Sequence, residues 1–457
     1  MKRISLPLAG YPRVLLTTVT VQALATLPVV LFAVMQSRWL GASGRGQVVL
    51  LINLVFLALT VADFGFTATL PYHAGRRNED PGVVYGTFLG WSACSMIAVF
   101  VSMSVCAWLI PSFESAVHFE RFAPVIAVMM IVTQVANFLQ IEALSLKKFN
   151  SYNALIVICQ SVMPLLMLTV YLLHRTGISV ALVVVCYTAG NAAEICLGLC
   201  LGKGRVVKQL ARLSVSLTSL RARLGVGVKA FASRMIEQIL NRADVFLIFF
   251  ILRDARSVGV YSIAVLLLTA WTAVPGWAAL TILPKAAHDD PGIAALTVKL
   301  CYWAVALAGV GAVAYILLGP VLSRIFVAVL GSSFHSTYRV FLFLLPRALL
   351  AGPCALIGSN LAGKGFTLYH PLSSFAGLIV SVVLMLALVP GYHLSGAAVA
   401  TSAGSFCQVV VLLVGFCRVN AFSFKDLIME AGNVRLDAVH FFWLLLGRKT
   451  PAGVAND

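Results

Sequence analysis

Apolar stretches long enough to cross a membrane as helices recur along the chain, and this pattern restricts the fold more than any other feature. A transmembrane helix needs about 20 consecutive, mostly apolar residues. Twelve stretches meet this requirement, so the sequence predicts an all-α polytopic membrane protein. They cover residues 14–37, 47–70, 83–110, 122–143, 152–173, 178–201, 229–251, 258–283, 296–318, 338–361, 368–390 and 395–417.

Composition supports the same class. The chain is 60% hydrophobic and 11% charged, whereas soluble domains are about half apolar and a quarter charged. The net charge of +17 would indicate nucleic-acid binding only if it formed a basic patch on a soluble face. Here Lys and Arg lie mostly in short connections between apolar stretches, which is the pattern of a membrane protein. We therefore expect membrane lipids, and no nucleic acid, as partners.

The distribution of positive charge also predicts the orientation of the chain. Lys and Arg concentrate at both termini and in the even-numbered connections, so both termini are expected on the cytoplasmic side. The first apolar stretch follows basic residues, as in a signal peptide, but no small-residue cleavage site precedes Arg38. We interpret it as an uncleaved first span.

The basic segment 202–228 divides the predicted spans into six and six. The expected organisation is an N-terminal lobe (1–201), a cytoplasmic linker (202–228), a C-terminal lobe (229–417) and a cytoplasmic tail (418–457). The tail contains "DAVHFFWLLLG", which is too short to span a membrane and is typical of an interfacial helix.

Short motifs recur between the two halves at nearly one offset. Gly46 corresponds to Gly259 and Pro71 to Pro284, each 213 residues apart, and "TAGN" at 188–191 corresponds to "SAGS" at 402–405. Because each half has an even number of spans, both halves enter the membrane in the same direction. This predicts a parallel repeat of two lobes with a central path between them.

The stretch "RMIEQILNRADVFLIFF" (234–250) carries charges inside a predicted span. At 100° per residue its polar side chains fall within one arc of about 160°. Each charge facing lipid would cost about 2.5–3.5 kcal/mol near mid-membrane. The stripe therefore either forms an internally neutralised ion-pair cluster or lines a hydrated cavity for a charged substrate or ion. Its members are Arg234, Glu237, Gln238, Asn241, Arg242 and Asp244.

Further charges fall in other predicted spans. Arg347 follows Pro346 in span ten, and a buried arginine favours phosphate or carboxylate partners. Asp63 in span two and Glu194 in span six either pair with arginines or bind a coupling H⁺ or Na⁺. The ten cysteines all fall in predicted spans without metal-ligand spacing, so no metal site or resident cofactor is expected.

Catalytic signatures do not emerge from the sequence. It has no "GxxxxGK[ST]" motif for ATP, and no Ser/His/Asp or Cys/His arrangement at an informative spacing. A membrane polymerase or ligase would need a large extracytoplasmic loop, whereas the longest predicted one covers only 319–337. The chain is therefore not expected to be an enzyme.

Three segments resemble the polysaccharide transporters of the MOP flippase superfamily. They are "SRWLGASGRGQVVLLINLVFLALTVADFGFTATLPYHAGRR" (37–77), "NRADVFLIFFILRDARSVGVYSIAVLLLTAWTAVPGWAALTILPKAA" (241–287) and "LAGKGFTLYHPLSSFAGLIVSVVLMLALVPGYHLSGAAVATSAGSF" (361–406). The resemblance implies a MATE-like fold and a Wzx-like flippase in the bacterial cytoplasmic membrane. Lipid II flippases of the superfamily usually have fourteen spans, so the twelve predicted here disfavour that reading.

Such a flippase would move an undecaprenyl-pyrophosphate-linked oligosaccharide to the outer leaflet, for O-antigen, capsule or exopolysaccharide, with a polysaccharide polymerase as a partner. From the charges of this sequence, Arg234, Arg242 and Arg347 are expected to hold the anionic headgroup. Glu237, Asn241 and Asp244 complete the predicted binding site, and Asp63 and Glu194 are ion-coupling candidates. The alternative is a Na⁺- or H⁺-coupled multidrug or metabolite antiporter, whose site would depend on Asp63 or Glu194.

Overall fold

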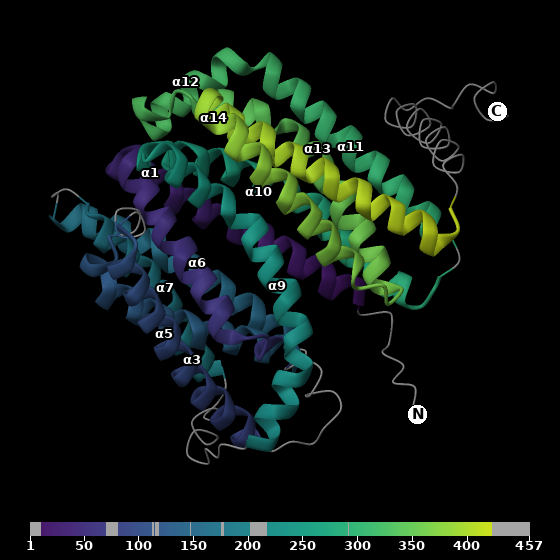
Figure 1. Cartoon of the computed structure of the whole chain (residues 1–457), viewed down its shortest axis with the longest axis horizontal. Coiled ribbons are helices and arrows are strands. Elements are labelled where there is room, and N and C mark those ends of the chain that lie inside the picture. The colour runs from purple at the N-terminus through teal and green to yellow at the C-terminus, as the bar shows by residue number, and fades with distance from the viewer. Residues whose placement is uncertain are drawn as a thin grey trace. The chain divides into compact units, whose positions relative to one another are not determined.

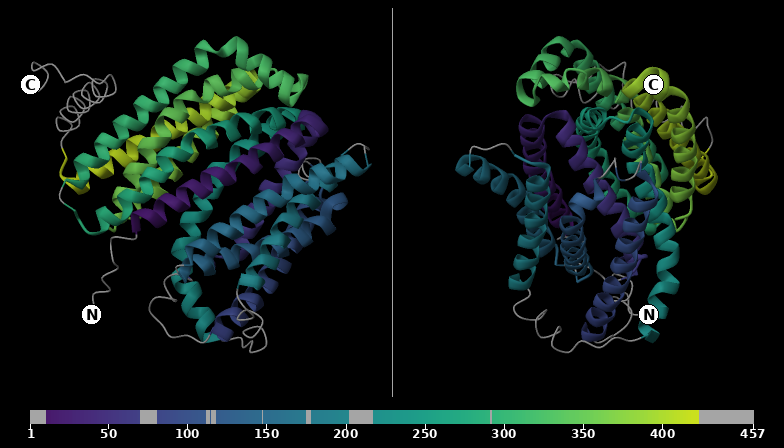
Figure 2. Two further views of the ribbon diagram at one scale, coloured as in Figure 1. Left: turned by 180° about the vertical axis from the view of Figure 1, so that it is seen from behind. Right: turned by 60° about the vertical axis from the view of Figure 1, so that its left-hand side comes forward.

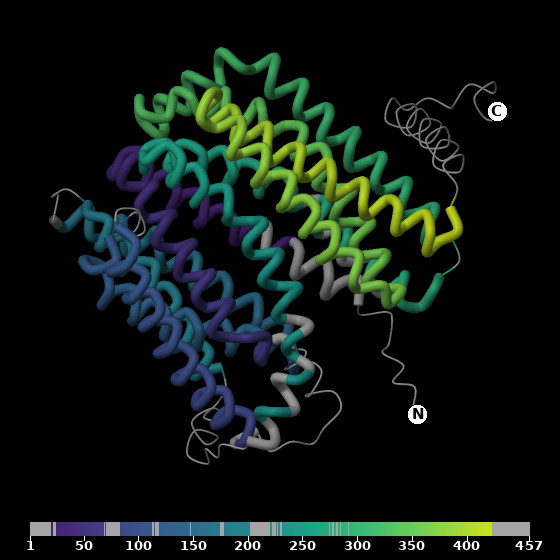
Figure 3. Tube along the Cα trace, in the orientation of Figure 1, coloured from purple at the N-terminus to yellow at the C-terminus, as the bar shows by residue number. Residues whose placement is uncertain are grey.

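The computed structural model describes residues 11–69, 81–111, 114, 118–146, 148–174, 178–201, 217–290 and 292–422 (Figures 1 and 3). Within these ranges the chain is helical and contains no strand, which confirms the predicted all-α class. The helices pack into two compact units. Unit 1 comprises residues 1–266 and 323–337, and unit 2 comprises residues 267–322 and 338–457. The predicted lobe limits stay a prediction.

Nine helices in the described ranges are long and apolar enough to cross a membrane. Helices α1 (Tyr11–Asp63) and α14 (Tyr369–Asn420) each cover two predicted spans, and each contains one residue with non-helical backbone angles, Gly41 and His393. Helix α9 (Leu217–Leu252) is not among the nine, because it carries too many charged side chains. The count of twelve crossings therefore stays a prediction.

Unit 1 is a bundle in which α6 (Phe149–His174) packs on α1 and on α7 (Val180–Leu201), and α5 (Phe119–Ser145) packs on α7 (Figure 2). Helices α3 (Pro81–Leu109) and α9, the start of α10 (Ala255–Ala287), the end of α12 (Gly319–Leu330) and η2 (Ser332–Phe334) complete the unit. One buried cluster joins α1, α6 and α7 and includes two cysteines. It contains Phe32, Met35, Val48, Cys159, Met163, Met167, Val183 and Cys186.

Unit 2 is built from α11 (Ile293–Leu317), α13 (Thr337–Gly363), α14 and the rest of α10 and α12. Its core includes a cluster of Val298, Ile357, Leu361, Leu412 and Phe416. A chain of polar groups crosses this core. The amide of Asn360 donates to Thr297 Oγ1 over 3.0 Å, and the amide of Asn420 donates to Asn360 Oδ1 over 3.2 Å.

Large apolar side chains on the outer faces of the helices are exposed. On α11, Leu307, Val310 and Leu317 expose 61%, 69% and 75% of their surface. A soluble monomer rarely exposes contiguous apolar surface on this scale, whereas lipid solvates it without penalty. The exposed faces therefore agree with a multi-pass membrane protein.

The repeat-related turns contact each other inside unit 1. A Cβ atom on Gly46 would collide with the carbonyl oxygen of Ala255, and one on Gly259 would collide with that of Ala42. Ala42 and Ala255 are themselves 213 residues apart, like the two glycines. The contact is thus reciprocal, as expected of two equivalent turns, and it requires glycine because only glycine lets the backbones approach so closely.

Some helices begin or end at other residues than the predicted spans and connections. The span predicted to reach residue 70 ends at Asp63, because a turn with positive φ at Phe64 and Gly65 follows. Residues 217–228 of the predicted linker form the first turns of α9. The predicted loop 319–337 contains α12, an apolar helix of 12 residues. The predicted interfacial helix in the tail lies outside the described residues.

Candidate functional site

Helix α9 approaches the end of α1 closely, and two glycines permit this. A Cβ on Gly65 would collide with the carbonyl oxygen of Gly227 on α9. Gly65 also has a φ of 76°, which favours glycine. Next to this contact, the rings of Phe64 and Phe231 stack with their centroids 4.5 Å apart. Arg234 follows Phe231 by almost one helical turn, so this packing brings its guanidinium to the end of α1.

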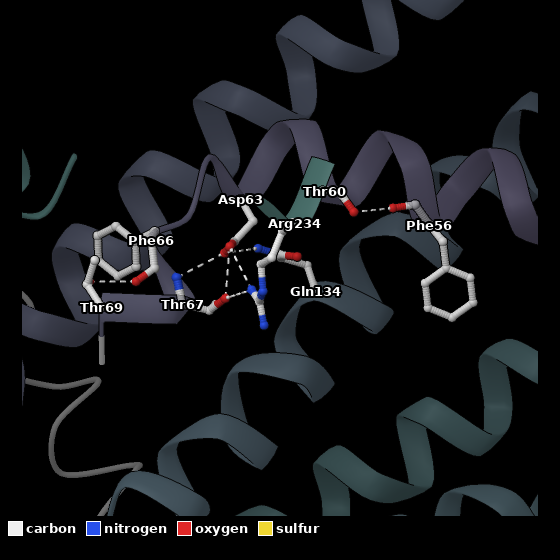
Figure 4. Close-up of polar contacts among 8 residues, drawn as sticks. All are labelled: Phe56, Thr60, Asp63, Phe66, Thr67, Thr69, Gln134 and Arg234. Atoms are coloured by element: carbon white, nitrogen blue, oxygen red, sulfur yellow. Dashed lines mark hydrogen bonds and ion pairs between the residues drawn. The ribbon is translucent and has the colours of Figure 1, made fainter. Parts of the chain in front are cut away.

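Asp63 is the centre of a polar network at that point (Figure 4). The Arg234 Nη1 atom lies 3.6 Å from Asp63 Oδ2 and donates to Thr67 Oγ1 over 3.1 Å. Thr67, in the short helix η1 (Thr67–Thr69), donates its backbone N–H and its hydroxyl to the Asp63 carboxylate over 3.2 and 2.8 Å. The amide of Gln134 on α5 completes the shell, donating to Asp63 Oδ1 over 3.5 Å.

The two charges of this network differ in accessibility. The Asp63 side chain is 10% exposed, whereas that of Arg234 is 47% exposed. The carboxylate is therefore held by donors on several sides, while the guanidinium keeps N–H groups free to bind a further anion. Asp63 thus pairs with an arginine, one of the two alternatives that the sequence left open, and its predicted role in ion coupling stays a prediction.

A cavity of about 410 Å³ opens beside this pair. Its walls come from the second half of α1, the turn after it, α5, α6 and α9. Polar side chains make up much of the lining, which is unusual for helices of this hydropathy. They are Thr60, Asp63, Thr67, Gln134, Asn137, Gln140, Tyr152, Arg234 and Gln238. The first part of the α9 stripe thus faces a cavity, one of the two options that the sequence left open.

The second part of the stripe takes part in packing. Arg242 donates from Nε to Gln238 Oε1 over 2.7 Å, bonds to Asn53 Oδ1, and lies 4.5 Å above the ring of Phe56. Asp244 is buried, and its carboxylate accepts hydrogen bonds from the Tyr261 hydroxyl and the Val245 N–H. These partners anchor α9 to α1 and α10, so this end of the stripe serves helix packing.

The remaining predicted binding residues are not brought to this cavity. Glu237 and Asn241 are exposed on α9 and are not among the lining residues. Arg234 pairs with Asp63 rather than with Glu237. Arg347 is half-buried on α13 and belongs to unit 2, and its predicted role stays a prediction.

Glu194 on α7 is in a different situation from Asp63. It is 0% exposed, and neither carboxylate oxygen accepts a hydrogen bond of normal geometry within the described part of the chain. Gln140, Tyr152 and Cys159 lie around it. An isolated buried carboxylate is costly unless it takes up a proton or gains a partner, so Glu194 is the carboxyl group better suited to bind an ion.

Several residues of the cavity were not singled out from the sequence. Gln134, Asn137 and Gln140 recur every third residue along an apolar helix. The rotation of 100° per residue that places the α9 stripe on one face also places these three side chains on one face of α5.

Arg45, outside the cavity, is another buried polar residue that the sequence analysis does not single out. It is buried, donating to Ser262 Oγ over 3.0 Å, to the Ala33 carbonyl over 3.1 Å and to Gln36 over 3.0 Å, and stabilises the hairpin beside Gly46.

The long apolar helices define a multi-pass membrane protein with a polar cavity, and comparison with known proteins assigns its family. Residues 14–284 match the family described as "Polysaccharide biosynthesis protein". Because this match covers more than half of the chain, the protein belongs to that family. No curated protein matches the chain.

Solved structures show that the fold is that of the MOP superfamily. The lipid II flippase MurJ in an inward closed conformation has a TM-score of 0.70 at 13% identity, covering 95% of this chain and 94% of its own. An inward-facing multidrug resistance MATE transporter has a TM-score of 0.63 at 14% identity, covering 87% and 95%. The MATE transporter VcmN of Vibrio cholerae has a TM-score of 0.59 at 11% identity, covering 91% and 98%. At these identities the likeness concerns the fold alone.

Proposed function

We propose that the protein is a flippase for undecaprenyl-pyrophosphate-linked oligosaccharides in the bacterial cytoplasmic membrane, supplying O-antigen, capsule or exopolysaccharide synthesis. The observation that carries this proposal is the half-exposed Arg234 beside a polar cavity within an apolar helical bundle. A guanidinium binds phosphate oxygens through paired N–H groups. The amides and hydroxyls of the same cavity suit the hydroxyl groups of a sugar.

Asp63 has a defined part in this proposal. An arginine alone in an apolar bundle would be costly and would retain a diphosphate tightly. A fixed carboxylate at 3.6 Å lowers both the cost of the empty site and the net attraction for the anion. The lipid is thus bound weakly enough to be released into the outer leaflet, and alternating access of the two repeats would carry the headgroup past the apolar core.

We propose further that Glu194 binds the coupling ion, and that this ion is H⁺. Its carboxylate is buried, and neither oxygen accepts a hydrogen bond of normal geometry among the described residues. A proton neutralises it without a coordination shell, whereas Na⁺ would need several oxygen ligands arranged around it. We also propose that both termini lie in the cytoplasm and that a polysaccharide polymerase uses the lipid after translocation.

The test is reconstitution in sealed liposomes that contain the lipid-linked oligosaccharide, with its exposure followed by an added sugar-modifying enzyme. We expect the lipid to equilibrate between the leaflets faster in liposomes that contain the protein than in empty liposomes. The rate is measured both with and without a proton gradient. A glycolipid with the same sugar and chain but an uncharged linker should move more slowly. If neither lipid moves, while a cationic drug exchanges for protons, the antiporter alternative is correct.

A further inference from the structure

An apolar groove runs between α3 and α5 in unit 1. It has a volume of about 400 Å³, within the range of about 300–1,000 Å³ of ligand pockets. Its lining comes only from these two helices and is almost entirely hydrocarbon and thioether, including Phe88, Ala93, Met96, Ile97 and Met130. The groove exists because small residues, Ala93 and Ala127, stand where larger side chains would fill the space between the helices.

This groove adjoins the polar cavity. Gln134 lines both, with a side chain that is 2% exposed and an amide that donates to Asp63. The residues on one side of Gln134 are thus apolar, and those on the other carry hydrogen-bonding groups and the accessible Arg234, whose counter-ion Asp63 is buried. A ligand that reaches across Gln134 must be amphipathic, with an anionic polar end and a hydrocarbon end.

We infer that the groove between α3 and α5 binds the diphosphate-proximal part of the isoprenoid chain while the headgroup occupies the cavity at Arg234. This inference rests on the proposed function, because the occupant is the tail of the proposed substrate. Ile97, Val101 and Ile131 expose 66%, 53% and 53% of their surface. The groove is therefore open along its outer edge, so the rest of a long chain can continue into lipid.

The lining chemistry suits this occupant. Met96, Met130, Phe88 and Phe100 offer adaptable thioether and aromatic surfaces to a branched, unsaturated chain. In a lipid environment, apolar contact alone selects weakly between hydrocarbons. The selectivity therefore depends on tethering, since a chain whose headgroup is already held at Arg234 is presented to the groove at high effective concentration.

A pair of matched substitutions on one helix tests the inference. Ala93 lines the groove, whereas Ala98 is an exposed residue of α3 that does not. Ala93→Trp fills the groove, and Ala98→Trp adds the same side chain on the lipid-exposed surface. The probe is undecaprenyl-pyrophosphate-linked oligosaccharide with a photoreactive diazirine in an isoprene unit near the diphosphate. Labelled peptides of the full chain are identified by mass spectrometry.

The inference predicts label in residues 88–101 and 127–135, removed by excess unlabelled substrate but not by excess phospholipid. Ala93→Trp should reduce this label and the initial translocation rate by about tenfold, and Ala98→Trp should leave both unchanged. Label spread over all exposed helices, or displaced by phospholipid, would show ordinary lipid contact and overturn the inference. So would equal behaviour of the two variants.

The same assays separate this inference from the proposed function. If the wild-type protein translocates the lipid but the groove is unlabelled, the groove inference fails and the flippase stands. If the wild-type protein does not translocate the lipid and no competable label appears, both fail. Competable label in the groove without translocation supports the binding site and contradicts the flippase.

Discussion

Arg234 and Arg242 lie eight residues apart on one face of α9, yet their surroundings differ. Arg234 is half-exposed in a polar cavity and has a buried carboxylate as its counter-ion. Arg242 is bound to Gln238 and Asn53 and covered by the ring of Phe56. A polar stripe in an apolar helix therefore need not have a single role. One end of α9 offers an anion site, and the other end anchors the helix.

The largest effect on transport is expected at Arg234. Arg234→Gln should lower the rate of lipid translocation in liposomes by about tenfold or more, because a charge-assisted hydrogen bond to phosphate is lost. Arg234→Lys, which keeps the charge but not the planar fork, should restore part of the rate. Both variants should insert and unfold like the wild type. A normal translocation rate for Arg234→Gln would contradict the role assigned to Arg234.

The next effect is expected at Glu194. Glu194→Gln keeps the size of the side chain and imitates its protonated form. The protein should then fold normally, and translocation should no longer respond to an imposed pH gradient. The matched variant Asp63→Asn should keep the response to the gradient, since Asp63 serves Arg234. If the gradient response persists in Glu194→Gln, the ion binds elsewhere.

At Arg242 the expected effect is on stability. Arg242→Gln removes hydrogen bonds and a cation–π contact, which should destabilise the protein by about 1–3 kcal/mol. Thermal unfolding in detergent measures this loss, and Arg234→Gln, at a half-exposed site, provides the comparison. The translocation rate per folded molecule should change little. A variant with wild-type stability and impaired transport would reverse the roles assigned to the two arginines.

The smallest effect is expected at Gln134. Gln134→Ala removes one 3.5 Å hydrogen bond to Asp63, and a bond of this length contributes little, about 0.5–1.5 kcal/mol at most. The translocation rate should fall about threefold, with Gln134→Glu more harmful because it places a second carboxylate beside Asp63. An effect of Gln134→Ala as large as that of Arg234→Gln would mean that the amide contacts the substrate itself.

The sequence predicts some of this arrangement well and some of it poorly, for physical reasons. Hydrophobic length identifies the helices, and the 3.6-residue period places the α9 stripe on one face, because both depend on local spacing. The pairing of Asp63 with Arg234 depends on the approach of α9 to the turn at Gly65, which joins segments more than 160 residues apart. No local pattern reveals such a contact. The packing of Arg242 cannot be predicted from local sequence for the same reason, since its partners Asn53 and Phe56 lie on α1.

The internal repeat, in contrast, is a long-range relation that the sequence does predict. Gly46 and Gly259 were paired from sequence by their common offset, and their reciprocal contacts with Ala255 and Ala42 give the pairing a structural reason. The amides of α5 carried a comparable signal in their three-residue spacing. They were not recognised because neutral polar residues are less conspicuous in an apolar helix than charged ones.

The central claim, that the Arg234 end of α9 receives the anionic headgroup, is tested most directly by equilibrium binding. Undecaprenyl-pyrophosphate-linked oligosaccharide would be titrated into the purified wild type, Arg234→Gln and Arg242→Gln at several salt concentrations. We predict that Arg234→Gln weakens the affinity about tenfold and reduces its dependence on salt, while folded Arg242→Gln binds like the wild type. Equal affinities of the wild type and Arg234→Gln, or a loss confined to Arg242→Gln, would contradict the account.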